Sequence, residues 1–275
     1  MALTMGSAPF GHEPRGVFND AVSVDGRVIW WEDSPRRVRG ILAGEVVLDS
    51  RRVKLLHETG HIVRWYFPRA DVREELLEPS DRHTHCPIKG GASYVSVRAG
   101  DRVSRDAAWT YPGPVAGAPP LAGYLSFFWD ALDEWWEEDQ QVFVHPRDPY
   151  HRVDVLNSSR HVRIIVGGEA VADSRRPRIL FETGLPMRLY LPRMDVRMDL
   201  LTPSETVTAC PYKGRTVHFD LTRDGRTWSD IAWSYPFPIP ECPKIENLVC
   251  FYDERVDAVE VDGETLAKPV TPWSK

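Results

Sequence analysis

The sequence predicts an all-β protein built from two tandem, small antiparallel β domains, each with a short helical turn. Three observations predict this class. The chain repeats itself at a constant offset. Most of its segments alternate apolar and polar residues between turn signals, which is typical of half-buried strands. Its 275 residues have room for two domains of ordinary size.

The duplication is visible in four separate motifs. "GEVVLDSRRVKLLHETG" recurs as "GEAVADSRRPRILFETG", "YFPRADVREELLEPS" as "YLPRMDVRMDLLTPS", "THCPIKG" as "TACPYKG" and "AAWTYP" as "IAWSYP". Each recurrence lies 124 residues after its first copy, as in Cys86 and Cys210. We expect the two copies to pack as a pseudo-dimer. The predicted boundaries are an N-terminal extension (1–27), the copy 1 β domain (28–143), a linker (144–157) and the copy 2 β domain with a C-terminal tail (158–275).

Each copy is expected to contain the same elements in order. Hairpins at 38–50 and 162–174 bend at Ala-Gly and Gly-Gly, and strands follow at 63–68 and 187–192, each ended by Pro. A short helical turn is expected at 70–80 and 194–204, a hairpin at 92–112 and 216–236, and a strand followed by a turn at 121–139 and 245–264.

The string His57-Glu58-Thr59-Gly60-His61 satisfies the HExxH signature of zinc proteases, which requires a helix. Its flanks are rich in Val, Ile and aromatic residues, and its centre holds a Gly, so a hairpin turn at Glu58-Thr59-Gly60 fits better. Copy 2 keeps Glu182-Thr183-Gly184 and replaces both histidines. The shared element is therefore a turn, and the histidines are interpreted as surface residues near it.

Zinc is the one cofactor that the sequence leaves open as an alternative; otherwise no cofactor is predicted. Its ligands would be His57, His61, His85 and Cys86, all in copy 1. The four cysteines form no CxxC pair, which argues against a zinc ribbon and against a disulfide framework.

Composition limits the classes of partner. The formal net charge of −6 speaks against general nucleic-acid binding. The first residues lack the basic and apolar regions of a signal peptide, and no apolar run is long enough to cross a membrane. We expect a cytoplasmic protein that binds a small molecule and neither nucleic acid nor membrane.

The strongest candidate for chemistry is the Cys-Pro-x-Lys-Gly motif, which predicts a tight turn. Lys89, three residues after Cys86, could lower the pKa of the thiol and make it a nucleophile, or it could neutralise an anionic substrate while Cys86 packs as a small apolar residue. Glu58 is the expected partner of Lys89, and Glu182 that of Lys213. Cys86, Lys89 and Glu58 are the candidate catalytic residues.

Two further groups complete the candidate site. Asp71 could pair with Arg73, or serve as an N-cap or turn residue, and Asp195 with Arg197 is the equivalent in copy 2. Trp109 and Tyr111 share one strand face, and Tyr66 is expected on a neighbouring strand; the rings form a slot for a flat or cationic ligand, or pack as core. The candidate ligand-binding residues are Tyr66, Asp71, Trp109, Tyr111, Glu182, Lys213, Cys210, Trp233 and Tyr235.

With these motifs in this order, both copies resemble the bacterial domain-of-unknown-function family number 427. The resemblance implies similarity to the β-tent folds, which include methionine sulfoxide reductases and Mss4-like zinc domains, and hence an all-β domain with a groove between sheets. Many β-tent proteins hold zinc with two CxxC pairs, which neither copy has. A nucleotidyltransferase-like activity would need a glycine-rich phosphate loop or paired metal-binding aspartates, and the sequence has neither.

Two functions remain open. The first is a small-molecule site, for a ligand that Lys89 suggests is anionic, with catalysis in copy 1, where the motifs keep more polar residues. The second is a non-catalytic structural or protein-interaction module, in which the repeated residues hold turns and strands. The sequence does not decide between an enzyme and a binding protein.

Overall fold

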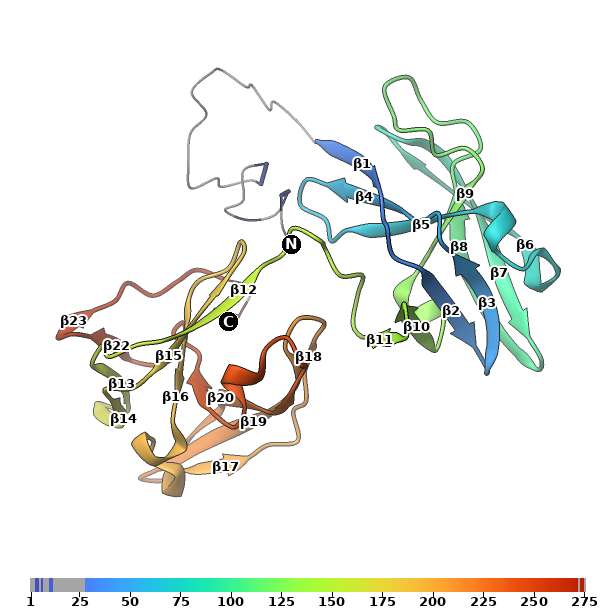
Figure 1. Cartoon of the computed structure of the whole chain (residues 1–275). Coiled ribbons are helices and arrows are strands. Elements are labelled where there is room, and N and C mark those ends of the chain that lie inside the picture. The colour runs from blue at the N-terminus through green and yellow to red at the C-terminus, as the bar shows by residue number, and fades with distance from the viewer. Residues whose placement is uncertain (1–2, 5, 7–9, 12–27, 272, 275) are drawn as a thin grey trace, which may run out of the picture. The chain divides into compact units, whose positions relative to one another are not determined.

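The computed structural model describes residues 3–4, 6, 10–11, 28–271 and 273–274, and the chain divides into two compact units, 1–150 and 151–275 (Figure 1). The described residues form antiparallel strands and short 3-10 turns, as the all-β prediction requires. Within the described residues, no helix is long and apolar enough to cross a membrane. Most of the expected N-terminal extension lies outside the described residues.

Unit 1 contains two antiparallel sheets. In spatial order, the seven-stranded sheet consists of β1 (Ile29–Asp33), β4 (Lys54–Glu58), β5 (Arg64–Pro68), β9 (Tyr124–Phe127), β8 (Arg102–Thr110), β7 (Gly90–Ala99) and β6 (Leu77–Cys86). The four-stranded sheet consists of β11 (Gln140–Val142), β10 (Glu134–Glu137), β2 (Val38–Leu42) and β3 (Glu45–Ser50).

Unit 2 repeats this plan. Its larger sheet consists of β12 (Val153–Asn157), β15 (Arg178–Glu182), β16 (Arg188–Leu191), β21 (Val249–Phe251), β20 (Arg226–Pro238), β19 (Gly214–Arg223) and β17 (Leu201–Pro203), with β18 (Ala209–Cys210) also paired to β19. The smaller sheet consists of β14 (Glu169–Ser174), β13 (Val162–Val166), β22 (Ala258–Val261) and β23 (Glu264–Thr265). Strands at matching sequence positions hold matching places in the two larger sheets, so the duplication extends to topology.

Two details differ from the expectation. The segment predicted as a linker contains β12, because residues 153–157 match β1 and pair with β15 as β1 pairs with β4. The single helical turn expected in each copy is a pair of three-residue 3-10 turns, η1 (Arg69–Asp71) and η2 (Glu74–Leu76) in unit 1, and η4 (Arg193–Asp195) and η5 (Met198–Leu200) in unit 2. Each pair of turns gives way directly to a strand, since β6 begins at Leu77 and β17 at Leu201, so no residues remain in the segment for a longer helix.

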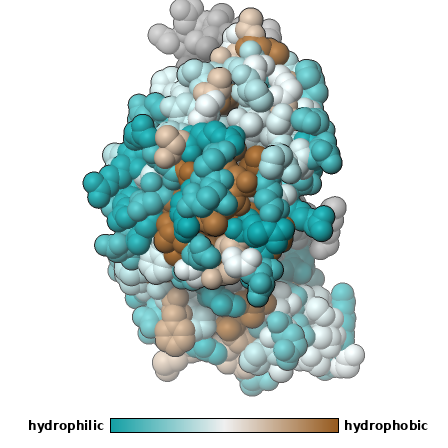
Figure 2. All heavy atoms as spheres, turned by 90° about the vertical axis from the view of Figure 1, so that its right-hand side faces the viewer, coloured by the Kyte–Doolittle hydropathy of each residue, from teal (hydrophilic) through white to brown (hydrophobic). Residues whose placement is uncertain are grey.

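The larger sheet of each unit is apolar on both faces. In β5, Trp65 and Phe67 belong to the main core, while Tyr66 between them belongs to a second cluster, as alternation along a strand requires. We call the second cluster the outer cluster; its buried members are Leu56, Tyr66, Ala92, Tyr94, Tyr111 and Leu121 in unit 1. In unit 2 they are Val155, Leu180, Tyr190, Trp233, Tyr235, Cys242, Ile245 and Cys250. The space-filling view in Figure 2 shows hydrophobic atoms exposed between polar side chains on one face of the molecule.

Candidate functional site

The predicted ion pair forms in both copies. Glu58 ends β4, and Lys89 lies in the turn between β6 and β7; Lys89 Nζ lies 2.5 Å from Glu58 Oε2. Both side chains are buried, with 11% of Lys89 and 4% of Glu58 exposed. Lys213 makes the same ion pair with Glu182 in copy 2. The prediction that these residues are partners is confirmed.

In copy 2, His151 is a third member of the group. His151 Nε2 lies 3.0 Å from Glu182 Oε1, and the ring of His151 stacks on Tyr212 with the centroids 3.9 Å apart. Burial alone would raise the pKa of Glu182, but the charge of Lys213 and hydrogen bonds from His151 and Lys213 lower it to about 2. Burial likewise works against the charged form of Lys213, yet Glu182 raises the lysine's pKa. This pair therefore stays charged at neutral pH.

The Cys-Pro-x-Lys-Gly segment forms the predicted tight turn. Cys86 pairs with Gly90 across the β6–β7 hairpin, and Lys89 N donates to Cys86 O at 3.3 Å. Gly90 has a φ of +105°, and a Cβ there would lie 3.0 Å from the Gly113 carbonyl oxygen. Only glycine fits this backbone, and the same holds at Gly214 in copy 2, with a φ of +110°. The turn places the half-buried Cys86 at the margin of the outer cluster.

The predicted aromatic residues lie together on the outer face. Trp109 Nε1 donates to Tyr66 Oη at 3.3 Å, and Trp233 Nε1 donates to Tyr190 Oη at 3.2 Å. Tyr111 is buried in the same cluster, where desolvation, with Cys86 and Glu58 nearby, raises its pKa to about 12. The ion pair, the thiol and the rings therefore share one face of the larger sheet.

The two copies differ in how open this face is. Trp233 is buried, with 7% of its surface exposed, and so are Tyr235 and Lys213. In copy 1, Trp109 is only half-buried, and Phe128, whose ring centroid lies 4.8 Å from that of Trp109, is 37% exposed. The same residues thus form a closed core in copy 2 and a partly open surface in copy 1.

Asp71 does not take the expected partner. Its carboxylate accepts a hydrogen bond from Ser50 Oγ at 2.7 Å and pairs with Arg52, while Arg73 pairs with Glu75 and Glu45. Copy 2 repeats this, with Asp195 bonded to Ser174 and Arg176. The predicted Asp71–Arg73 pair is wrong, and Asp71 is a turn residue, the last one of η1, rather than an N-cap. It instead fastens the 3-10 turn to the end of β3.

The HExxH string does not form a helix. Glu58 ends β4, and Gly60, with a φ of +78°, supplies the predicted hairpin turn. His57 is 1% exposed, so its interpretation as a surface residue is wrong; its Nε2 lies 2.9 Å from Glu32 Oε1 and its Nδ1 lies 3.6 Å from Asp148 Oδ2. His61 is exposed, and its Nδ1 lies 3.0 Å from the Thr59 carbonyl oxygen. Among the described residues, no group of three or more His, Cys, Asp or Glu side chains is placed to hold a metal ion, and the zinc alternative gains no support.

The comparison with protein families agrees with the repeat. A family model described as "Domain of unknown function (DUF427)" matches residues 30–138 and again 154–262. The chain belongs to the DUF427 family. A comparison with curated proteins finds no match. The second DUF427 match begins inside β12, so the family model also includes this strand in the domain.

Besides His151, sequence reasoning missed one pair of arginines on this face. Arg64 in the first DUF427 copy and Arg188 in the second both begin the strand that carries the buried tyrosine, and both lie over the repeated tryptophan. The signal was present, because "VRWYFP" and "MRLYLP" keep Arg at the same position while most of their other residues change.

Proposed function

We propose that copy 1 binds a small molecule on the outer face of its larger sheet, next to the Glu58–Lys89 pair and over the Tyr66–Trp109 pair. The observation that carries this proposal is a buried ion pair beside a hydrogen-bonded Tyr and Trp, repeated at matching positions on a face that does not belong to the main core. A domain gains little stability from a buried ion pair, because desolvation offsets most of the attraction. A binding role for this face would explain why the ion pair and the Tyr–Trp pair are present.

The openness of copy 1 supports placing the ligand there. Trp109 and Cys86 are half-buried, and Phe128 is exposed beside Trp109. Lys89 is already neutralised by Glu58, so in this proposal the pair fixes the turn and the floor of the site. Any covalent step at this face would use Cys86, whose thiol is the nucleophilic group at its margin.

A structural role is the second candidate, and the burial of copy 2 favours it there. Trp233, Tyr235 and Lys213 are all at least nine-tenths buried, as residues that only stabilise a fold would be. In this alternative both faces serve packing, and neither copy binds a metabolite.

A thermal-shift screen of metabolites separates the two functions. Trp109→Phe removes the indole N–H and part of the ring surface, and Trp233→Phe is the matched control in copy 2. A compound that raises the Tm of the wild type and of Trp233→Phe, but not of Trp109→Phe, supports the proposal. If no compound does so, or if all three proteins respond equally, the proposal is wrong and the structural role remains.

A further inference from the structure

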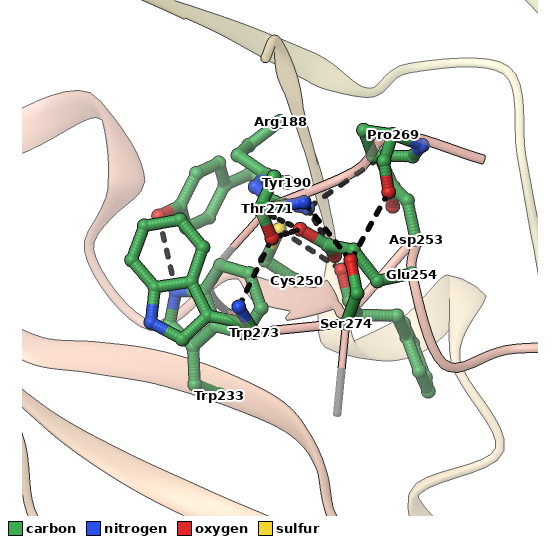
Figure 3. Close-up of polar contacts among 11 residues, drawn as sticks. Arg188, Tyr190, Trp233, Cys250, Asp253, Glu254, Pro269, Thr271, Trp273 and Ser274 are labelled. Carbon is green, nitrogen blue, oxygen red and sulfur yellow. Dashed lines mark hydrogen bonds and ion pairs between the residues drawn. The ribbon is translucent and has the colours of Figure 1, made fainter. Parts of the chain in front are cut away.

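In copy 2, Arg188 is fully enclosed by partners. Its Nη1 and Nη2 donate to the two carboxylate oxygens of Glu254 at 2.9 and 2.6 Å, and Asp253 lies 3.8 Å away (Figure 3). The Glu254 side chain is 0% exposed, and that of Arg188 is 9% exposed. This is the two-pronged geometry in which a guanidinium group binds a carboxylate most strongly.

Aromatic rings complete the enclosure. The Arg188 guanidinium carbon lies 5.6 Å from the centre of the Trp233 ring and 5.8 Å from that of Trp273. Trp273 belongs to the segment that follows β23, and Thr271 of the same segment donates from Oγ1 to Glu254 Oε1 at 2.6 Å. Figure 3 shows both residues reaching the arginine and its carboxylate. Copy 2 thus fills its own arginine–tryptophan site with the Glu254 carboxylate, flanked by Asp253, and with the ring of Trp273.

Copy 1 has the same arginine and tryptophan but neither filling group. The Arg64 guanidinium lies 6.0 Å from the centre of the Trp109 ring, and both residues are half-buried. Among the residues that the structure describes, the Arg64 side chain has no carboxylate within ion-pair distance and no hydrogen-bond partner. Asp130, at the position equivalent to Glu254, is exposed.

The local sequence explains this difference. Trp129 replaces Asp253, and its ring packs on Trp65 and Trp135 of the main core at centroid distances of 5.8 and 5.4 Å. Trp135 Nε1 also donates to the Trp129 carbonyl oxygen at 2.9 Å. These contacts anchor the turn after β9 to the other face of the sheet, so that Asp130 remains exposed and does not pair with Arg64.

From this comparison we infer that the Arg64–Trp109 face of copy 1 binds a planar aromatic carboxylate, with the acid on Arg64 and the ring over Trp109 and Phe128. Glu254 and Trp273 display in copy 2 the two groups that such a ligand carries. The inference rests on the proposed function and specifies its ligand class, and the anion preference comes from Arg64 because Lys89 is already paired.

The test compares indole-3-carboxylate with its neutral isostere indole-3-carboxamide, titrated by NMR into the full chain. We expect the acid to bind at least about tenfold more tightly than the amide, the difference that one charge-assisted pair supplies. Arg64→Ala should weaken binding of the acid by the same factor and leave the affinity for the amide unchanged. Arg51→Ala, which removes an exposed arginine of the same unit, should bind both like the wild type.

Two results would contradict the carboxylate assignment. Equal affinity for acid and amide, or an Arg64→Ala variant that binds the acid like the wild type, overturns the carboxylate assignment. If metabolites still bind in a manner that depends on Trp109, the proposed function survives that result. If neither probe binds and no metabolite raises the Tm, both the inference and the proposed function fail.

Discussion

Lys89 and Glu58 join two turns that lie 31 residues apart, and Lys213 and Glu182 join the same two turns in copy 2. One turn connects β4 to β5, and the other connects β6 to β7. Each pair therefore fastens two separate hairpins at one corner of the outer face. Because the charges are buried, removing one partner leaves the other without compensation in a poorly solvated place.

This arrangement makes a prediction for stability. Lys89→Met alone should destabilise copy 1 by about 3 kcal/mol, because Glu58 is then buried without a cation. The double variant Glu58→Gln with Lys89→Met should be destabilised less than the single variant, since no charge is left unpaired. Urea unfolding of the wild type, both single variants and the double variant measures this coupling. If the two single effects simply add, the pair has no special role in stability.

The sequence was sufficient for the features that repeat. The succession of strands and turns along each copy and the Glu58–Lys89 pair all follow from residues that recur at one offset, because a pairing retained twice is visible without coordinates. The Asp71–Arg73 pair was predicted from neighbouring positions and is wrong. Its true partners, Ser50 and Arg52, come from a hairpin about twenty residues earlier, and strand register brings them there.

The position of Arg64 over Trp109 in copy 1 could not be predicted from the sequence for a similar reason. Arg64 begins β5 and Trp109 lies on β8, and the two strands are neighbours of the same strand, β9, in the sheet. Their contact therefore depends on long-range strand pairing, which local sequence does not reveal. The burial of His57 depends likewise on Glu32 and Asp148, which lie far from it in the chain. Local patterns predict which residues form strands, and tertiary pairing determines which side chains meet across them.

The Tyr–Trp hydrogen bonds should differ in strength between the copies. Tyr66→Phe and Tyr190→Phe each remove the acceptor of an indole N–H. Water can replace the acceptor at the half-buried Trp109, whereas the buried Trp233 is left with an unsatisfied donor. We expect a cost of about 0.5 kcal/mol for Tyr66→Phe and about 2 kcal/mol for Tyr190→Phe in chemical denaturation. Equal costs would contradict the difference in openness.

Cysteine accessibility gives a second contrast. Cys86 and Cys210 are half-buried, while Cys242 and Cys250 are buried. Burial raises the pKa of the Cys242 thiol to about 11, which keeps it protonated and unreactive at neutral pH. Iodoacetamide added to the folded protein should therefore label Cys86 and leave Cys242 and Cys250 unlabelled, as read by peptide mass spectrometry. Labelling should disappear at this position in Cys86→Ser.

The labelling rates of Cys86 and Cys210 test whether Cys86 is an activated nucleophile. The two thiols occupy the same turn, so a purely structural cysteine should react equally fast at both places. A nucleophile belonging to an open copy 1 site should react faster at Cys86. Equal labelling rates would remove the argument for covalent chemistry in copy 1.

The pH dependence of the free energy of unfolding should show the titration of the buried Asp253 carboxyl. Burial raises the pKa of its carboxyl to about 7, although nearby Arg188 works in the opposite direction. In the unfolded chain this group titrates near its ordinary value of 3.8. The folded state therefore holds the proton more tightly, so the stability associated with this group is greatest below pH 4 and falls as pH rises toward and through 7.

Asp253→Asn removes this titration while keeping the shape of the side chain. We expect the variant and the wild type to have similar free energies of unfolding at pH 4, and the variant to be the more stable by on the order of 3 kcal/mol at pH 8. Asp224→Asn is the control, because Asp224 is exposed in a turn where its φ of +48° suits asparagine. Urea titrations at both pH values measure the difference. A gain at pH 8 no larger than that of the control would mean that Asp253 is ionised in the folded protein without cost, with Arg188 as its effective counter-ion.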